Sequence, residues 1–318
     1  MDPVMSDTAG ASSARPEGGR ALGPGTGSSA SGRARRRRRR RAVYRKPEGN
    51  ITPDEAAAAE LERFGEERST ALVEDARNIL PIGSDSRSGE GNARHGRDAG
   101  AERSDTVILL RLSAGRRGAT AVSVPRDLTV DVPGCRRPDG SRSEPVFAMF
   151  DSAFVVGRSS CAIRTVEKPT GIRVDHHVVV DFAGFKDVID AVGGVGVCPR
   201  EPDEDAGPGL PAGRVTPNGE QALGHVRARK ALGDGSDTGR MERRQRFLGA
   251  LAHTRGGNDV LLNPVRPYPV LDAAASSLTT DPGLAGPRSP YGLVRGLRDI
   301  PTEDVQFLTV PGSRTSGT

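Results

Sequence analysis

Large apolar side chains are nearly absent from the first 50 residues and recur in short runs from residue 78 onward. Residues 1–50 are rich in Gly, Ser, Ala and Arg, and such a segment cannot bury enough surface to offset the entropy of chain ordering. The pattern predicts a disordered arginine-rich tail over 1–50, a helical linker over 51–76, one folded domain over 77–311 and a disordered end over 312–318.

The linker carries signals for the start of a helix. Thr52 can act as the N-cap and Pro53 suits the first helical position. Asp54 and Glu55 would then lie at the positive end of the helix dipole. Because the segment has few apolar anchors, we expect a helix of only a few turns.

Within the domain, apolar runs of strand length alternate with segments of helical periodicity. The predicted strands are 78–83, 106–112, 119–124, 193–199 and 304–311, and the run 178–182 fits either a strand or the entry to a helix. The predicted helices are 150–168 with a break near Gly157, a helix over 182–192 capped by Asp181, 218–228, 239–254 and 292–300. This alternation indicates an α/β fold in which helical layers cover a mixed sheet.

The net charge of +5 and the pI of about 9.5 are typical of proteins that bind nucleic acid. The distribution of the charge along the chain argues against this interpretation. Residues 1–50 hold 12 of the 46 basic residues and 4 of the 41 acidic ones, so the tail carries +8 and the remainder −3. The chain has no Trp, 3 Tyr and 8 Phe, which leaves few sites for stacking on bases. Nucleic acid is therefore not an expected partner of the domain.

Two clusters of acidic and basic residues fall at predicted strand ends. Asp85 and Arg87 follow the first strand, the position at which open α/β sheets bind ligands. Asp105 enters one strand, and Arg126 and Asp127 leave the next. If those two strands are antiparallel neighbours, these residues lie at one sheet edge, away from the turn. The pattern favours a phosphate ligand with a divalent cation, and the alternative is a network that only ties down strand ends.

Six arginines form a third cluster, Arg227, Arg229, Arg240, Arg243, Arg244 and Arg246. The last four fall in one predicted helix, where the first three of them share a face. Asp237 precedes this helix, whose positive end can itself hold a phosphate. In a body of net negative charge the cluster indicates an anionic ligand, and the alternative is a charged, solvent-exposed helix.

These residues include no nucleophile paired with a base. The sequence lacks a GxSxG motif, a phosphate-loop lysine and a Cys/His pair. The residues alone therefore predict an α/β domain that binds a pyrophosphate or polyphosphate through arginines, with a divalent cation.

Five segments resemble a known family in this order: NILPIGSDSR, RSDTVILLRL, SVPRD, TVEKPTGIRVDHHVVVDFAGFKDVIDAVGGVGVC and NGEQALGHVRARKALGDGSDTGRMERRQRFL. They closely resemble the LytR–CpsA–Psr family of cell-envelope proteins in its actinobacterial form. The resemblance covers about residues 77–311 and implies a three-layer α/β/α sandwich with a hydrophobic pocket for a polyprenyl chain. It also implies a phosphotransferase that moves a glycopolymer, such as teichoic acid or arabinogalactan, from a polyprenyl-pyrophosphate carrier to peptidoglycan during cell-wall assembly.

The resemblance also implies roles for residues of the three clusters. Asp85 and Asp105 would bind Mg²⁺ or Mn²⁺. The implied catalytic residues are Asp105, Arg126 and Asp127. The implied pyrophosphate-binding residues are Arg87, Arg126, Arg227, Arg229 and Arg240, and the implied supporting residues are Asp237, Arg243 and Gln245.

Some positions depart from the family pattern. Where the family shows K-x-N-x-A-[YF], this chain has Met149 and Asp151 in place of the lysine and asparagine. A lost cation and a gained carboxylate would both weaken pyrophosphate binding. Pro81 interrupts an apolar strand and removes a backbone N–H that would pair with a neighbouring strand. Separately, we expect His176 and His177 to lie on an edge strand.

The family has a basic cytoplasmic segment, a membrane helix and an external catalytic domain. This sequence contains the basic segment. It shows no apolar run of 18 residues after this segment and no secretory signal before it. The resemblance predicts an extracytoplasmic location at a membrane surface. Two alternatives remain, a diverged member that binds polyprenyl phosphate or wall polymer without transfer, and a nucleic-acid-binding regulator acting through its arginine tail.

Three cysteines, Cys135, Cys161 and Cys198, have no zinc-site spacing and allow at most one internal disulfide. Cys135 and Cys161 flank one loop and would pair outside the cell, leaving Cys198 free. Buried reduced thiols are the alternative.

Overall fold

The computed structural model describes residues 51–71, 73–85, 102–204, 209–228, 237–252, 278–286, 300 and 304–311. The predicted tail and C-terminal end, and all of the predicted helix 292–300 except Ile300, lie outside these residues. The described residues all belong to one structural unit, Ala42–Thr318.

The main sheet of this unit is mixed. In spatial order its strands are β1 (Thr52–Pro53), β8 (Leu278–Thr280), β7 (His176–Val180), β2 (Arg77–Ser84), β3 (Ser104–Leu112), β4 (Ala119–Val124) and β9 (Val305–Thr309). Strand β3 runs antiparallel to both of its neighbours, whereas β7 runs parallel to β2 and β9 runs parallel to β4. A short 3-10 turn, Ala114–Arg116, joins β3 to β4.

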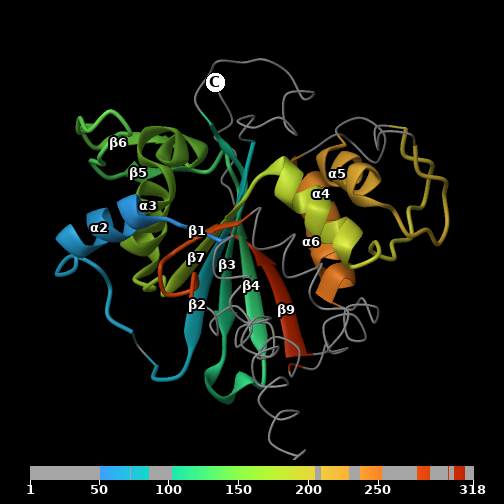
Figure 1. Cartoon of the computed structure of the whole chain (residues 1–318), viewed down its shortest axis with the longest axis horizontal. Coiled ribbons are helices and arrows are strands. Elements are labelled where there is room, and N and C mark those ends of the chain that lie inside the picture. Colours follow the sequence, from blue (N-terminus) through green and yellow to red (C-terminus); the bar gives the residue numbers. More distant parts are fainter. Residues whose placement is uncertain are drawn as a thin grey trace, which may run out of the picture. The chain divides into compact units, whose positions relative to one another are not determined.

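Helices cover both faces of the sheet (Figure 1). One layer holds α2 (Glu55–Arg63), α3 (Asp151–Thr170) and a hairpin of β5 (Thr129–Val132) and β6 (Val146–Met149). The other layer holds α4 (Phe182–Ala191), α5 (Gly219–Arg227) and α6 (Asp237–Ala252). The predicted three-layer α/β/α sandwich is thus confirmed. Among the described helices, none combines the length and apolar character needed to cross a bilayer.

Strand residues alternate between two buried clusters because successive side chains point to opposite sheet faces. Leu80 and Ile82 of β2 pack with Phe154 of α3 in the first cluster. Ile79 of β2 and Leu112 of β3 belong to a second cluster. Both faces of the central strands are therefore buried, as their continuous apolar runs predicted.

The second helical layer has a core of its own. Ile189 of α4, Ala222 of α5 and Phe247 of α6 are buried in one cluster. Asp181 caps α4, and its Oδ1 accepts the amide hydrogen of Gly184 at 2.7 Å. This cap and the positions of α5 and α6 confirm the sequence predictions for these helices.

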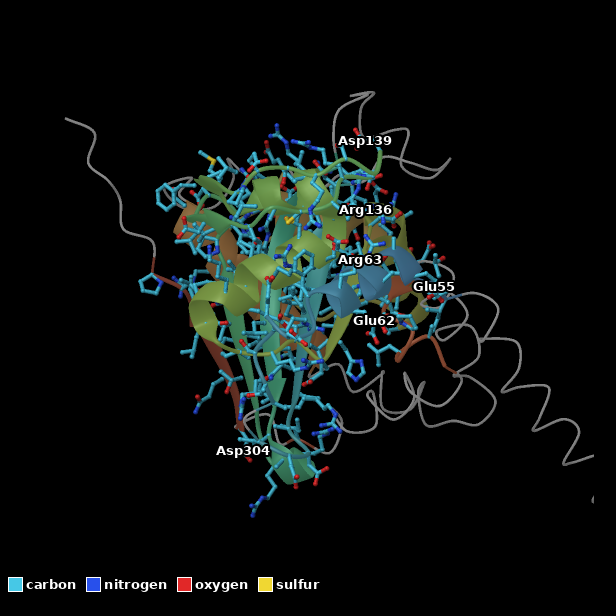
Figure 2. All side chains as sticks on the ribbon, turned by 90° about the vertical axis from the view of Figure 1, so that its left-hand side faces the viewer. Glu55, Glu62, Arg63, Arg136, Asp139 and Asp304 are labelled. Carbon is cyan, nitrogen blue, oxygen red and sulfur yellow. A yellow bond between two sulfur atoms is a disulfide. The ribbon has the colours of Figure 1, made fainter. Side chains whose placement is uncertain are left out.

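Helix α3 is broken at Gly157, as the sequence predicted. Gly157 and Arg158 have non-helical backbone angles, and Arg158 has a φ of 56°. A Cβ atom at residue 157 would lie 2.8 Å from the Cβ of Cys161 and 2.9 Å from that of Cys135. These two cysteines form the predicted disulfide, which Figure 2 shows beside α3, while Cys198 is free and exposed. The break thus lets α3 pass close to the disulfide.

The predicted start of the first helix is wrong. Thr52 and Pro53 form β1, parallel to β8, and Asp54 is the N-cap of α2 because its Oδ1 accepts the amide hydrogen of Ala57 at 3.0 Å. Leu61 of α2 is buried in the main core. Figure 2 shows the polar side of this helix facing outward. The segment therefore packs as part of the sandwich, whereas the sequence predicted a linker.

Other local predictions also fail. Residues 193–199 form no strand, and only an isolated bridge joins Val197 to Val215. Gly193 and Gly194 have φ values of 83° and 89°, which turn the chain out of an extended path. The predicted edge strand containing His176 is instead internal, because β7 lies between β8 and β2. Pro81 likewise lies in an internal strand, opposite Val178 of β7.

Candidate functional site

Asp105 and Arg126 form an ion pair at one end of the sheet. The register of β3 and β4 pairs Val107 with Val124, and continuing it by two residues places Asp105 opposite Arg126. Nη1 of Arg126 lies 2.7 Å from Oδ1 of Asp105, and the two side chains are 31% and 24% exposed. The pair lies away from the β3–β4 turn, so the predicted convergence of these two residues is confirmed.

A β-bulge sets the orientation of Asp105. Strand β3 pairs Thr106 with Gly83 but Ser104 with Ser84, so Asp105 is an extra residue in this strand. Bulges redirect a side chain and increase the local twist. Nothing in the sequence predicted this feature, because a bulge depends on the register between two strands.

Asp85 lies at the same end of the sheet. Its amide donates to the carbonyl oxygen of Arg103 at 3.0 Å, and its Oδ1 accepts the Arg103 amide hydrogen at 2.6 Å. These two bonds hold Asp85 against the segment that leads into Asp105. The structure therefore brings the two predicted metal ligands to adjacent strand ends.

Helix α6 is tied to this end by side chains of successive residues. Arg244 Nη1 donates to the carbonyl oxygen of Asp105 at 2.7 Å, and Arg243 Nη1 donates to that of Ala228 at 2.7 Å. Gln245 Nε2 donates to Thr309 Oγ1 at 2.8 Å. Arg243 and Gln245 thus hold α6 to neighbouring elements, which fits a supporting role.

The contact of Arg244 with Asp105 was not predicted. The sequence placed Arg244 on an arginine-bearing helix face, but the resemblance gave it no role. Its Nε also lies 3.4 Å from the carbonyl oxygen of Val226, one residue before the end of α5. Arg244 therefore links β3, α5 and α6 at the candidate site.

Arg227 is the last residue of α5, and its guanidinium carbon lies 4.3 Å from the ring centroid of Phe182. Arg244 donates hydrogen bonds both to the carbonyl oxygen of Val226, the neighbour of Arg227, and to that of Asp105. The connection between Arg227 and Asp105 is therefore indirect.

Other predicted site residues are not placed by the structure. Arg87 and Arg229 lie outside the described residues, and Asp237 and Arg240 belong to α6 with side chains that are not described.

One of the residues that depart from the family pattern, Asp151, lies beside Arg126. The amide of Asp151 donates to the carbonyl oxygen of Arg126 at 3.0 Å. Met149 is 56% exposed on β6. Asp127 is exposed in the turn after β4. The extra carboxylate of Asp151 is thus attached close to the proposed phosphate-binding arginine.

The carboxylates at this end of the sheet are compatible with a magnesium ion that is coordinated jointly by protein carboxylates and by substrate phosphate oxygens. Among the described residues, no group of three His, Cys, Asp or Glu side chains could hold a metal by itself. Mg²⁺ commonly binds one or two carboxylates together with substrate phosphates. Asp85 and Asp105 are two carboxylates at adjacent strand ends, and the metal-binding role implied for them stays a prediction.

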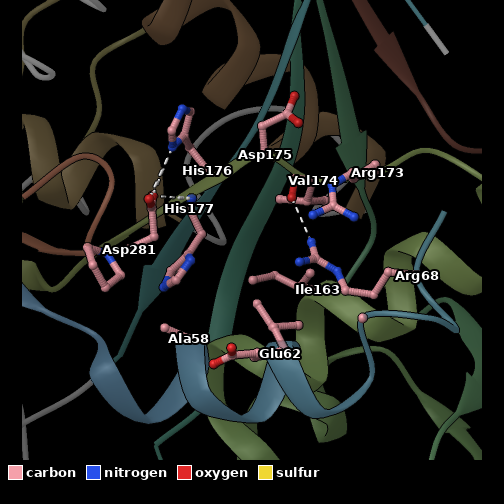
Figure 3. Close-up of a pocket in the computed structure, with 13 residues that line it drawn as sticks. Ala58, Glu62, Arg68, Ile163, Arg173, Val174, Asp175, His176, His177 and Asp281 are labelled. Carbon is pink, nitrogen blue, oxygen red and sulfur yellow. Dashed lines mark hydrogen bonds and ion pairs between the residues drawn. The ribbon is translucent and has the colours of Figure 1, made fainter. Parts of the chain in front are cut away.

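A separate cavity of about 470 Å³ lies between α2 and the start of β7 (Figure 3). Its walls include Arg68, which donates to the carbonyl oxygen of Val174 at 2.7 Å, and His176, whose Nδ1 lies 3.1 Å from Oδ1 of Asp281. None of the predicted site residues lines this cavity. Its lining combines apolar residues such as Leu61 and Ile163 with charged ones, and the hydrophobic polyprenyl pocket implied by the resemblance stays a prediction.

The fold and site define an α/β/α domain with an aspartate–arginine pair and additional arginines at one end of a mixed sheet. The chain belongs to the LytR_cpsA_psr family, whose sequence model matches residues 49–318. The resemblance found in the sequence motifs is thus confirmed.

Named relatives support this assignment. The chain is 35% identical over 237 residues to the probable cell wall biosynthesis protein LcpB of Corynebacterium glutamicum, covering 71% of this chain and 54% of LcpB. It is 32% identical over 219 residues to TagU of Oceanobacillus iheyensis, a polyisoprenyl-teichoic acid–peptidoglycan teichoic acid transferase, covering 66% of this chain and 64% of TagU. The chain therefore spans about half the length of LcpB.

A solved structure has the same fold. Bacillus subtilis TagV matches with a TM-score of 0.58 and 25% sequence identity, covering 76% of this chain and 87% of TagV. The likeness extends over most of both chains, which supports the α/β/α assignment for the domain.

Proposed function

We propose that this protein transfers a glycopolymer from a polyprenyl-pyrophosphate carrier to peptidoglycan. Family membership and the similarity to TagU, a teichoic acid transferase, support this reaction class. The observation that carries the proposal is the Asp105–Arg126 pair at the sheet end, with Arg244 bound to the Asp105 backbone.

The proposed reaction is a phosphoryl transfer. The acceptor hydroxyl oxygen attacks the phosphorus that carries the glycopolymer, and the bond from this phosphorus to the bridging oxygen of the pyrophosphate breaks. The products are a phosphodiester and polyprenyl phosphate. Such a reaction needs alignment and neutralisation of charge more than a protein nucleophile, in agreement with a site made of arginines and carboxylates.

Arg126 would bind the pyrophosphate oxygens, and its guanidinium offers several donors in one plane. Asp105 fixes the orientation of Arg126 and is the candidate to accept the proton of the acceptor hydroxyl. Asp85 and Asp105 would hold Mg²⁺, which when bound supplies additional neutralisation of phosphate charge. Arg243 and Gln245 would keep α6 in position.

The test is a transfer assay with a synthetic polyprenyl-pyrophosphate-linked glycan and purified peptidoglycan. We expect product formation with Mg²⁺ and its loss with a chelator. Arg126→Ala should abolish transfer, whereas Arg63→Ala, which removes an exposed arginine from α2, should leave the rate unchanged. A protein that binds no polyprenyl pyrophosphate at any Mg²⁺ concentration would exclude the proposed function.

A second candidate function is binding of polyprenyl phosphate or wall polymer without transfer. It is favoured by Asp151, whose amide is bonded to Arg126, and by Met149 on the adjacent strand. Under this alternative the unaltered protein binds the carrier but has almost no turnover. The double variant Met149→Lys with Asp151→Asn would then raise turnover, whereas rapid transfer by the unaltered protein would exclude the alternative.

The proposed reaction requires an extracytoplasmic location at the membrane surface, where carrier and peptidoglycan meet. Cell fractionation followed by immunodetection measures this directly. Recovery of all of the protein from the cytosol would contradict the proposed reaction, because its acceptor lies outside the cell.

A further inference from the structure

Exposed apolar side chains are concentrated on one strand. Among the described residues, five large hydrophobic side chains are strongly exposed, and three of them lie on β6. Phe147 is 69% exposed, Met149 56% and Val146 48%. Val146 is opposite the buried Val132, whereas Phe147 and Met149 share the other face of the strand. Exposed apolar surface of this kind can mark a binding site, and the transfer reaction proposed above assigns no role to Phe147.

The hairpin has one buried and one exposed face. Val132 is buried with Cys135 and Ala153, and Ala148 packs against the same cluster. Because side chains alternate along a strand, Phe147 and Met149 project from the other face. The buried face thus holds the hairpin against α3 beside the disulfide.

The exposed face also contains two polar residues. The antiparallel register places Asp131 opposite Phe147 and Thr129 opposite Met149. Directly opposite residues of an antiparallel pair share a face. We name these four residues, Phe147, Met149, Asp131 and Thr129, the hairpin face. It presents an aromatic ring and a thioether next to a carboxylate and a hydroxyl.

The backbone of the hairpin is connected to the segment that carries Arg126. The Phe150 amide donates to the carbonyl oxygen of Leu128 at 2.9 Å, and the Asp151 amide donates to that of Arg126 at 3.0 Å. These bonds extend the pairing of β5 and β6 as far as Arg126. The hairpin therefore leads directly into the turn that carries Arg126, the residue proposed to bind pyrophosphate.

We propose that the hairpin face binds a sugar ring of the acceptor glycan strand, an inference that rests on the proposed function. One side of a pyranose ring presents apolar C–H groups that can pack on Phe147 and Met149, and its hydroxyls can donate to Asp131 and Thr129. Apolar walls with a few polar groups that fix orientation are typical of small-ligand sites. A glycan has both properties.

Charge favours the acceptor glycan over a phosphate-rich polymer. The charged residue of the hairpin face is the acidic Asp131, which would repel phosphodiester groups. The loop between β5 and β6 includes Arg136 and Asp139, both visible in Figure 2. Its three arginines are accompanied by two acidic residues, so this loop is not a strongly cationic surface suited to anionic lipid.

The test is a binding titration with the full chain. The glycan probe is the β-1,4-linked tetrasaccharide of N-acetylglucosamine, and the comparison probes are a glycerol-phosphate oligomer and phosphatidylglycerol vesicles. We expect the tetrasaccharide to bind and Phe147→Ala to weaken its affinity about fivefold. Asp131→Asn should also weaken it, and Val73→Ala, at an exposed apolar residue outside the hairpin, should not.

A second titration, with geranylgeranyl pyrophosphate, distinguishes a failure of this inference from a failure of the proposed function. Pyrophosphate binding that is unchanged in Phe147→Ala, together with weaker tetrasaccharide binding, supports the inference. Pyrophosphate binding without any tetrasaccharide binding overturns it and leaves the proposed function standing. Binding of vesicles or the phosphate oligomer through Phe147 in place of the tetrasaccharide also overturns it. An unchanged melting temperature of Phe147→Ala shows that the variant is folded.

Discussion

Nε2 of His177 lies 3.2 Å from Oδ2 of Asp54, which joins the start of α2 to an internal strand of the sheet. The hydroxyl of Ser159, next to the break in α3, donates to the same oxygen. Asp54 is also the N-cap of α2. The Asp54 carboxylate thus links α2 and α3 to β7 through hydrogen bonds.

This arrangement predicts a pH dependence of stability. Burial raises the pKa of Asp54, but hydrogen bonds from His177, Ser159 and the Ala57 amide outweigh burial and lower the pKa below its ordinary value. A lowered folded-state pKa contributes stability that is present above the unfolded pKa of about 3.9 and is lost as the pH falls through the folded pKa.

Asp54→Asn should keep the cap, since Asn is also a favourable N-cap residue, while removing the charge. We expect the variant to be less stable than the unaltered protein at pH 6 and the difference to shrink below about pH 4. Urea unfolding at both pH values measures this. An equal difference at pH 6 and pH 3 would show that the charge of Asp54 is irrelevant.

The Asp105–Arg126 pair should matter more for binding than for folding. The two side chains are partly exposed, and such ion pairs contribute roughly 0–1 kcal/mol to stability. Asp105→Asn should therefore shift the free energy of unfolding by less than about 1 kcal/mol. The same change should weaken Mg²⁺-dependent binding of geranylgeranyl pyrophosphate by about tenfold or more. Calorimetry and unfolding on the same sample compare the two effects, and unchanged binding would remove Asp105 from the proposed site.

The disulfide should contribute substantially to stability. Cys135 and Cys161 are 26 residues apart, and closing a loop of this length stabilises a protein by about 3.5 kcal/mol in the chain-entropy model. We expect the double variant Cys135→Ser with Cys161→Ser to melt about 10 °C lower. Cys198→Ser is the control, because Cys198 is free and exposed. A melting temperature equal to that of the control would mean that this link adds no stability.

The close packing at the break in α3 predicts a steric effect. Gly157→Ala would place a methyl group within 3 Å of the Cβ atoms of both disulfide cysteines, so we expect a loss of about 1–3 kcal/mol. The control is Gly196→Ala, where no heavy atom lies within 4 Å of the added Cβ. The control should change stability by less than about 0.5 kcal/mol. Chemical denaturation of both variants makes the comparison, and equal stabilities would contradict the packing argument.

The predictions that held depend on short-range patterns. The apolar runs of β2, β3 and β4 identified buried strands, Asp181 identified a helix cap, and Gly157 identified a helix break. The predictions that failed involve competition between local and distant partners. Pro53 suits a helix start, but pairing of β1 with β8, more than 200 residues away, keeps it extended.

The candidate site likewise combines residues that the sequence predicted with contacts that only the structure revealed. Motifs and strand ends identified Asp105 and Arg126 and the sheet end at which they meet. The bulge at Asp105 and the contact from Arg244, separated from Asp105 by 139 residues, could not be predicted. Sequence spacing specifies what a residue can do within a few neighbours, whereas the register between strands and the docking of α6 specify which distant groups meet.

The amino-acid sequence by itself indicated the α/β class and the family and singled out candidate arginine and carboxylate residues, because alternation, caps and motif residues are local properties. Tertiary structure decided that α2 belongs to the core, that His177 lies inside the sheet and that Phe147 stands exposed on the β5–β6 hairpin. The physical reason is that burial and orientation depend on the free energy of packing over the whole domain, which no short segment contains.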